Sequence, residues 1–206
     1  ERALDALKAS PSAAARLRRA RPSLPLIAAV VRHAGEVGVA AARRALRRSL
    51  EGLRKRAEDI LPPGGRFMVF GRSGTVEDVV RSVGGRVVKD GPVDVGLVGA
   101  DALLPGGDFV NAAGTAAFLR RARELRAGVF AVAVELKRVR KAPKPEPGFE
   151  IVPARLVHAV LTETGLHYPP HGALPGVEPG WLDRGALNPS GHGEGLCHPH
   201  HRKPGE

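Results

Sequence analysis

The feature that most constrains the fold is an uninterrupted apolar run at residues 95–99, Val-Gly-Leu-Val-Gly. A strand with one face in water alternates apolar and polar residues, whereas a strand covered on both faces can be apolar throughout. Such strands are typical of parallel sheets that carry helices on both faces. The run therefore predicts a central strand of an α/β domain, lying between Asp94 and Asp101.

Strand-like and helix-like segments alternate on both sides of this run. Glycine and proline separate them, and the glycine pair at residues 84–85 is placed to end a helix. We predict strands at residues 66–70, 86–88, 94–99 and 128–134, helices at 76–83 and 111–126, and a strand or short helix at 157–161. This order predicts an α/β fold with a Rossmann-like, doubly wound parallel sheet.

The chain before the Pro62-Pro63-Gly64-Gly65 boundary has a helical pattern instead. Apolar residues recur at intervals of three and four in the segment 37–60, and arginines occupy the opposite face. We predict a helical N-terminal domain at residues 1–61 and the Rossmann-like domain at 66–168. Residues 169–206, rich in Gly, Pro and His, are predicted to form an irregular tail.

The formal net charge of +11 suits nucleic acids, anionic membranes or phosphorylated small molecules as partners. The arginines lie along helices without interleaved aromatic residues, which favours a solvated helix surface over nucleic-acid binding. No apolar run reaches the roughly 18–20 residues of a membrane span, and the N-terminal residues lack the order of a signal peptide. We therefore expect a cytoplasmic protein with no membrane partner.

Cysteine and most of the histidines are found in the predicted tail. Cys197 is the single cysteine, so an intrachain disulfide is impossible. With the nearby histidines at positions 192, 198, 200 and 201 it forms a cluster of residue types that bind zinc. The crowded Gly- and Pro-rich context favours an irregular tail, and we expect neither a metal nor a cofactor.

Polar residues after the apolar run mark a candidate ligand site. In open α/β sheets, ligands bind outside the carboxyl ends of the strands, which is where Asp101 is expected. A helix beginning near Asn111 would direct the backbone amides of its first turn, near Gly114 and Thr115, toward an anion such as phosphate. In a purely structural alternative, Asp101 lies in a turn and Asn111 is an ordinary helix N-cap.

The same stretch carries a motif: Gly-Ala-Asp at 99–101, Gly-Asp at 107–108, Asn111, and Gly-Thr at 114–115. It resembles the signature shared by the alpha, beta and delta subunits of translation initiation factor 2B, methylthioribose-1-phosphate isomerase and ribose-1,5-bisphosphate isomerase. Segments 67–76, 149–153 and 161–166 are similar to other parts of that family. The resemblance implies a helical N-terminal domain, a Rossmann-like C-terminal domain and a homodimer formed through the latter. It also implies an isomerase acid/base role for Asp101 and a substrate-holding role for Asn111.

The chain departs from the family at several positions. The loop expected to hold the isomerase cysteine reads Gly71-Arg72-Ser73-Gly74-Thr75, and Ala112 replaces a lysine. A strand–helix unit before the Gly-Ala-Asp motif is missing, so the domain is predicted to be shortened. The family's Arg-Gly-Ala phosphate-binding motif is absent as well. Because each positioned acid or base contributes about 10²–10⁴ in rate, efficient catalysis is not expected.

The sequence thus predicts an initiation factor 2B-like protein with a remnant site for a sugar phosphate or nucleotide phosphate, and a binding or regulatory role. The predicted ligand-binding residues are Gly71, Ser73, Thr75, Asn111, Gly114 and Thr115. Asp101 is the one candidate catalytic residue. Two alternatives stay open: an aldose–ketose isomerase acting on a phosphorylated pentose, and a nucleic-acid-binding protein that uses the arginines of residues 43–56.

Overall fold

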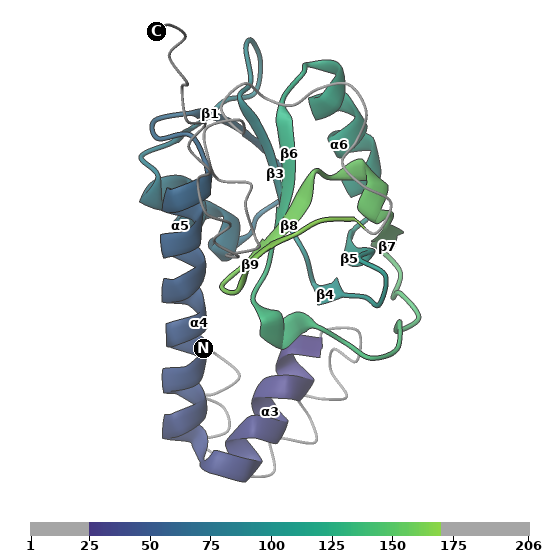
Figure 1. The fold of residues 1–206 in the computed structure, drawn as a ribbon. Helices are drawn as coiled ribbons and strands as arrows, with labels where there is room; N and C mark the ends of the chain where they lie inside the picture. The colour runs from purple at the N-terminus through teal and green to yellow at the C-terminus, as the bar shows by residue number, and fades with distance from the viewer. Residues whose placement is uncertain (1–24, 170–206) are drawn as a thin grey trace, which may run out of the picture.

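The computed structural model describes residues 25–169 (Figure 1). Residues 1–24 of the predicted helical domain and residues 170–206 of the predicted tail lie outside these residues. The elements, in chain order, are α3 (Pro25–Val37), α4 (Val39–Ile60), β1 (Arg66–Val69), α5 (Gly74–Ser82), β2 (Arg86–Val87), β3 (Val95–Gly99), β4 (Ala102–Leu103), β5 (Phe109–Ala112), α6 (Thr115–Glu124), β6 (Gly128–Val132), the 3-10 turn η1 (Glu135–Lys137), β7 (Phe149–Val152), the 3-10 turn η2 (Ala154–Leu156), β8 (Ala159–Thr162) and β9 (Gly165–His167).

A six-stranded sheet in the order β2-β1-β3-β6-β8-β9 forms the centre of the molecule. Every pairing in it is parallel except that of β9 with β8. The α4 and α5 helices lie on one face of the sheet and α6 lies on the other (Figure 1). All five residues of β3 and all five of β6 are buried, as expected for strands covered on both sides. The predicted doubly wound α/β fold is confirmed.

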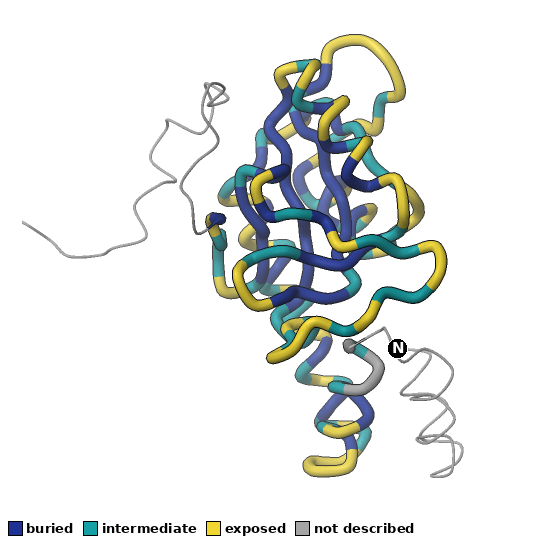
Figure 2. Tube along the Cα trace, turned by 90° about the vertical axis from the view of Figure 1, so that its right-hand side faces the viewer, coloured by how far each residue is buried: buried dark blue, intermediate teal, exposed yellow. Residues whose placement is uncertain are grey.

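Helix α4 links the helical segment to the sheet. Near its start, Ala42 and Leu46 pack against Val30 and Ala34 of α3. Toward its end, Leu53 and Ala57 enter the same core as strands β1, β3, β6 and β8. Figure 2 shows buried residues concentrated in the central strands and exposed residues in the connections. The helices and the sheet therefore share a core, and the division into domains at residue 61 stays a prediction. None of the helices among the described residues has the length and apolarity needed to cross a membrane.

A second, three-stranded antiparallel sheet, β4-β5-β7, corrects one prediction. Asn111 was expected near the start of a helix, but it lies in β5, where it is paired with Glu150 of β7. Helix α6 begins only at Thr115, after Gly114 adopts a φ of 96°, a conformation that favours glycine. Pairing with a strand almost forty positions later in the chain satisfies the β5 backbone, so it overrides the local helical preference of the Ala-rich sequence.

The amino ends of β1 and β3 are joined by an ion pair. The Asp94 carboxylate accepts hydrogen bonds from the Arg66 backbone N (2.8 Å), Nε (3.0 Å) and Nη2 (2.7 Å). The guanidinium hydrogen bonds lower the pKa of Asp94, against the smaller opposing effect of burial. Because one carboxylate binds both the backbone and the side chain of Arg66, it helps to fix the register between these two strands.

Candidate functional site

A cleft of about 260 Å³ opens at the carboxyl ends of β1 and β3, the edge of the sheet opposite the Arg66–Asp94 pair. Its polar lining comes from four separate parts of the chain: the loop after β1, the turn after β3, β5 and η1. The lining residues that bear on the chemistry are Gly71, Arg72, Ser73, Gly99, Asp101, Asn111 and Lys137. Four of the seven residues predicted from the sequence thus lie together: Gly71, Ser73, Asp101 and Asn111.

The loop after β1 presents the start of α5 to this cleft. Ser73 caps the helix, and its Oγ accepts a hydrogen bond from the backbone N of Val76 at 3.4 Å. The next amides, those of Gly74 and Thr75, lie in the first helical turn and have no acceptor within the helix. Gly99 lets β3 approach this cap closely, since a Cβ at that position would lie 3.2 Å from the Ser73 Oγ. The loop therefore offers amide donors to an anion.

The Asn111 side chain is held in the wall of the cleft. It is buried, with 9 % of its surface exposed, and its Nδ2 donates to the Thr115 Oγ1 at 3.0 Å. The Thr115 hydroxyl in turn donates to the Ala112 carbonyl at 2.6 Å. Thr115 thus orients Asn111 without lining the cleft itself, and neither Gly114 nor Thr75 is among the lining residues.

The N-terminus of α6, where the sequence predicted a phosphate, lies against a carboxylate of the protein. The backbone N of Ala116, in the first turn of that helix, donates to the Glu150 Oε1 at 2.8 Å. A carboxylate of the protein therefore occupies the position predicted for the anion and would repel a phosphate. The sequence could not show this, because Glu150 reaches α6 through the pairing of β7 with β5.

Lys137, in η1, is a site residue that the sequence analysis missed. Its Nζ donates to the Ala100 carbonyl at 2.5 Å. The residue as a whole is partly exposed, but protein surrounds its amine; this burial lowers the pKa of Lys137, and the negative charge of Asp101 opposes the effect. The sequence resemblance implies a lysine at the position of Ala112, and Lys137 supplies an amine to the cleft from another element. One signal was available: η1 follows β6 closely, so Lys137 falls at the carboxyl edge of the sheet.

No protein-family model and no curated protein matches this sequence. Solved structures do match. Translation initiation factor eIF-2B from Pyrococcus horikoshii OT3 superposes with a TM-score of 0.60 at 16% identity, over 73% of this chain and 78% of that one. The fold is that of the initiation factor 2B subunits.

Two further subunits agree with this assignment. The eIF2B beta subunit from Chaetomium thermophilum has a TM-score of 0.59 at 18% identity, over 76% of this chain and 73% of that one. The delta subunit from A. fulgidus has a TM-score of 0.54 at 16% identity, over 71% and 68% of the two chains. The resemblance predicted from the motifs is therefore confirmed at the level of the fold.

The cleft of this initiation factor 2B fold contains no thiol among the described residues. The loop from Gly71 to Thr75 has no cysteine, and Cys197 lies outside residues 25–169. Within that same range, no group of three or more His, Cys, Asp or Glu side chains is arranged to hold a metal ion. The ionisable side chains that line the cleft are Arg72, Asp101 and Lys137.

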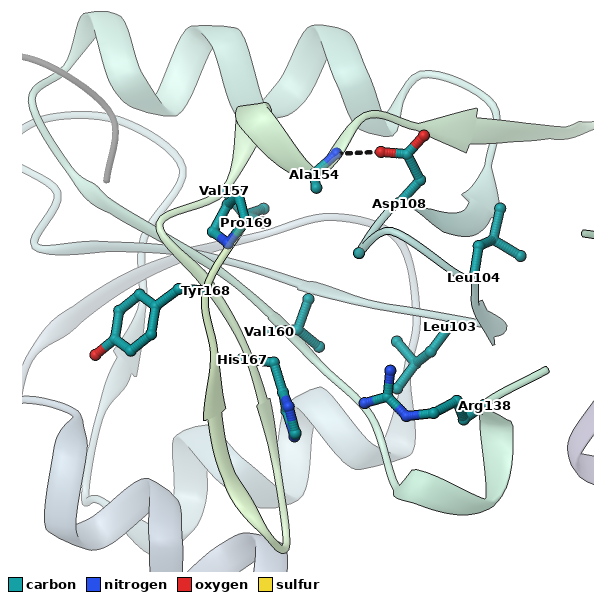
Figure 3. Close-up of a pocket in the computed structure, with 11 residues that line it drawn as sticks. Leu103, Leu104, Asp108, Arg138, Ala154, Val157, Val160, His167, Tyr168 and Pro169 are labelled. Atoms are coloured by element: carbon teal, nitrogen blue, oxygen red, sulfur yellow. Dashed lines mark hydrogen bonds between the residues drawn. The ribbon is translucent and has the colours of Figure 1, made fainter. Parts of the chain in front are cut away.

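The aspartate of the Gly-Asp motif has a structural role. Asp108 lines a separate hollow beside β8 and β9, and its Oδ1 accepts a hydrogen bond from the backbone N of Ala154 at 2.8 Å (Figure 3). That hollow measures about 30 Å³, which is room for a water molecule or two and not for a sugar phosphate. Asp108 thus ties the β4–β5 turn to η2, which follows β7, and does not belong to the cleft.

Proposed function

We propose that the chain binds a phosphorylated small molecule, a sugar phosphate or nucleotide phosphate, in the cleft at the carboxyl ends of β1 and β3, and that its role is binding or regulation. The observation that carries this proposal is the convergence of Asp101, Asn111, Arg72 and Lys137 on one cleft from four separate segments. A purely structural role for each would not require them to share a cavity.

The charge and size of the cleft suit such a ligand. Two cationic side chains and one carboxylate line it, so its net charge favours an anion. Its volume of about 260 Å³ lies just below the roughly 300–1,000 Å³ of sites that hold drug-sized molecules, which favours a small ligand. The apolar wall includes Phe70 and Phe149.

Each residue has a distinct role in this proposal. Arg72, Ser73 and the first amides of α5 bind the phosphate. Asp101 and Asn111 bind sugar hydroxyls, and Thr115 holds Asn111 in place. Lys137 neutralises part of the negative charge of the bound ligand. Gly71, with a φ of 68°, lets the loop turn toward the helix cap.

Ligand-induced thermal stabilisation tests the proposal. The panel contains pentose phosphates, nucleoside monophosphates, inorganic phosphate and ribose. A ligand at 100 times its Kd should raise the free energy of unfolding by about 2.7 kcal/mol. We expect a shift with one phosphorylated compound and none with ribose, because ribose lacks the anion.

Three variants locate the binding. Asp101→Asn and Lys137→Met should both weaken the shift, whereas Arg120→Gln, on the exposed side of α6, should leave it unchanged. The proposal fails if no phosphorylated compound stabilises the wild-type chain, or if all three variants keep the full shift.

The second candidate, an aldose–ketose isomerase, is favoured by the presence of Lys137 beside Asp101. Isomerisation needs a base that removes the proton from C2 and an acid that protonates the carbonyl oxygen at C1. Asp101 supplies a carboxylate for the first step. Lys137 supplies an amine whose pKa is lowered by burial, so that it gives up a proton more readily than an exposed lysine and suits the role of the acid.

Proton exchange separates the two candidates. The wild-type chain is incubated with the stabilising aldose phosphate in D₂O, and deuterium at C2 and any ketose product are measured by NMR. Exchange that disappears in Asp101→Asn would establish the isomerase. Tight binding with no exchange would leave a binding protein.

Assembly is a further prediction. One structural neighbour is a tetrameric eIF2B-beta2-delta2 complex from C. thermophilum, which this chain matches with a TM-score of 0.58. We expect a homodimer formed through the Rossmann-like domain, in the cytoplasm. Light scattering coupled to size-exclusion chromatography measures the mass directly, and a monomer at micromolar concentration would contradict the expectation.

A further inference from the structure

A third hollow is lined by the same segment that carries Lys137. It has a volume of about 650 Å³ and is open to solvent between α3 and the chain that follows β6. We refer to it as the basic groove. Its lining includes Ala29, Arg32, Leu136, Arg138, Arg140 and Lys141.

The backbone beneath these cations is anchored. The Val139 N donates to the Leu103 carbonyl at 2.9 Å, and Arg138 forms a parallel bridge with Leu103. Leu136, in the same segment, packs against the apolar cluster formed by α3 and α4. This part of the chain is therefore attached to the β4-β5-β7 sheet and to the helices.

The segment that follows β6 supplies one wall of the basic groove. Five of its residues line the groove, Leu136, Arg138, Val139, Arg140 and Lys141, whereas Lys137 lines the cleft. Three of these five are cationic, and Arg32 of α3 lies on the other wall.

The charge of the basic groove is one-sided. Four of its lining residues are cationic and none is acidic. Arg138 is already bound through Nε and Nη2 to the two carboxylate oxygens of Glu135. Arg32, Arg140 and Lys141 form no ion pair within the described part of the chain. These three charges are free to meet an anion.

The shape favours an extended anion over a small one. Sites for small molecules bury most of the ligand and are lined mainly by apolar groups with a few fixed polar atoms. The basic groove is open, has long charged side chains on both walls, and includes no aromatic residue on which a base or sugar ring could stack. Such a surface neutralises phosphates in a row without reading bases.

We propose that the basic groove binds the phosphodiester backbone of a nucleic acid, independently of its sequence. The contacts come from Arg32, Arg140 and Lys141, with Arg138 at the margin because Glu135 shares its charge. This inference does not depend on the phosphosugar site, because none of the groove cations lines the cleft and the test leaves Lys137 unchanged.

Fluorescence anisotropy of the full chain with short labelled RNA and DNA duplexes tests the inference. For about three phosphates neutralised, log K should fall with log salt at a slope near −3, measured from about 50 to about 200 mM salt. Duplexes of scrambled sequence should bind equally well. Whether RNA or DNA binds more tightly distinguishes the two sources of the same backbone chemistry.

A charge-matched pair of variants locates the binding. Arg140→Glu with Lys141→Glu should lower the affinity more than tenfold and make the salt slope shallower. Lys89→Glu with Arg120→Glu makes the same change in net charge on exposed residues outside the groove and should lower the affinity far less. Each variant is first checked for an unchanged unfolding temperature; if the glutamate variant is destabilised, Arg140→Gln with Lys141→Gln replaces it.

Several outcomes would overturn the inference. Equal loss in the two charge-matched variants would mean that only net charge matters. Loss with Arg44→Glu and Arg48→Glu, but not with the groove variant, would place binding on α4 instead. Absence of duplex binding at low salt, or an affinity that does not depend on the salt concentration, would contradict the proposal. The groove variant should also keep the phosphosugar shift, so that failure at one site is distinguished from failure at the other.

Discussion

The two edges of strand β3 carry the same kinds of charge and use them differently. At the amino edge, Asp94 and Arg66 share three hydrogen bonds with one another. At the carboxyl edge, Asp101 and Lys137 line a cleft of about 260 Å³ and attract each other across it. The first pair holds β1 and β3 in register, whereas the second pair leaves space in the cleft for a bound molecule.

The comparison shows that an acid and a base near one strand do not indicate a site by themselves. The two edges differ in how far the acid and the base of each pair satisfy each other's hydrogen-bonding groups. The carboxylate oxygens of Asp94 accept hydrogen bonds from Arg66. The Lys137 amine donates one hydrogen bond to the Ala100 carbonyl and has two further N–H groups. Such differences are conformational and do not follow from composition.

The largest expected effect comes from a substitution within β3, the strand that joins the two edges. A Cβ on Gly96 would lie 2.6 Å from the Ala122 Cβ of α6 and 3.1 Å from the Val129 Cγ1. Gly96→Ala should therefore lower the free energy of unfolding by about 1–3 kcal/mol, because the packed core must shift. Urea unfolding measures the change.

The matched control is Gly74→Ala in the first turn of α5, where a Cβ meets nothing within 4 Å. That substitution should be neutral or slightly stabilising, since alanine restricts the unfolded chain. Equal losses in both variants would show that contact with α6 is not what limits β3.

The next effect compares two isosteric substitutions, one at each edge. Asp94→Asn removes a carboxylate that accepts three hydrogen bonds and should lower the urea midpoint at neutral pH. Asp101→Asn should change the midpoint much less while weakening ligand binding. The reverse order would mean that the carboxyl edge is the structural one.

The dependence of stability on acidic pH gives a further test of the role of Asp94. The pKa of Asp94 is lower in the folded chain than the value near 3.9 of an unfolded one. Its stabilising contribution is therefore complete above about pH 3.9 and is lost as the pH falls through the folded-state pKa. Asp94→Asn should differ from wild type at neutral pH and converge with it in acid.

The smallest effect concerns Lys137 in alkali. Burial lowers its folded-state pKa below the value near 10.4 of an unfolded lysine, so between the two values the unfolded chain binds more protons. Stability should therefore rise with pH through that window. Lys137→Met should abolish the rise, and Lys55→Met, on the exposed face of α4, should keep it. A rise that persists without Lys137 would assign it to another group.

Patterns that depend on neighbours in sequence could be predicted. The apolar run at 95–99 indicated a buried parallel strand, because this pattern is visible in the sequence without knowledge of the strands that pair with it. The glycines at 84–85 marked the end of α5 in the same way. The cleft position of Asp101 followed from the rule for strand ends, together with a motif.

Patterns that depend on distant partners could not be predicted. Asn111 precedes an Ala-rich segment that favours helix, and only the pairing of β5 with β7 makes it a strand residue. Glu150 at the start of α6 follows from the same pairing. Lys137 lies outside the predicted strands and helices, and no neighbouring residue in the sequence reveals that its amine turns toward the Ala100 carbonyl.

The outermost strands of the six-stranded sheet limit how copies of the chain can associate. At one end, β2 is only two residues long and leaves Val87 57% exposed; at the other, β9 is three residues long and runs against its neighbour. Short outer strands present few unsatisfied amides and carbonyls to an incoming chain, which discourages continuous sheet formation between molecules. A stable oligomer would then depend on complementary side-chain surfaces. Its interface should tolerate substitutions in β2 better than substitutions of helix residues that contact the other copy.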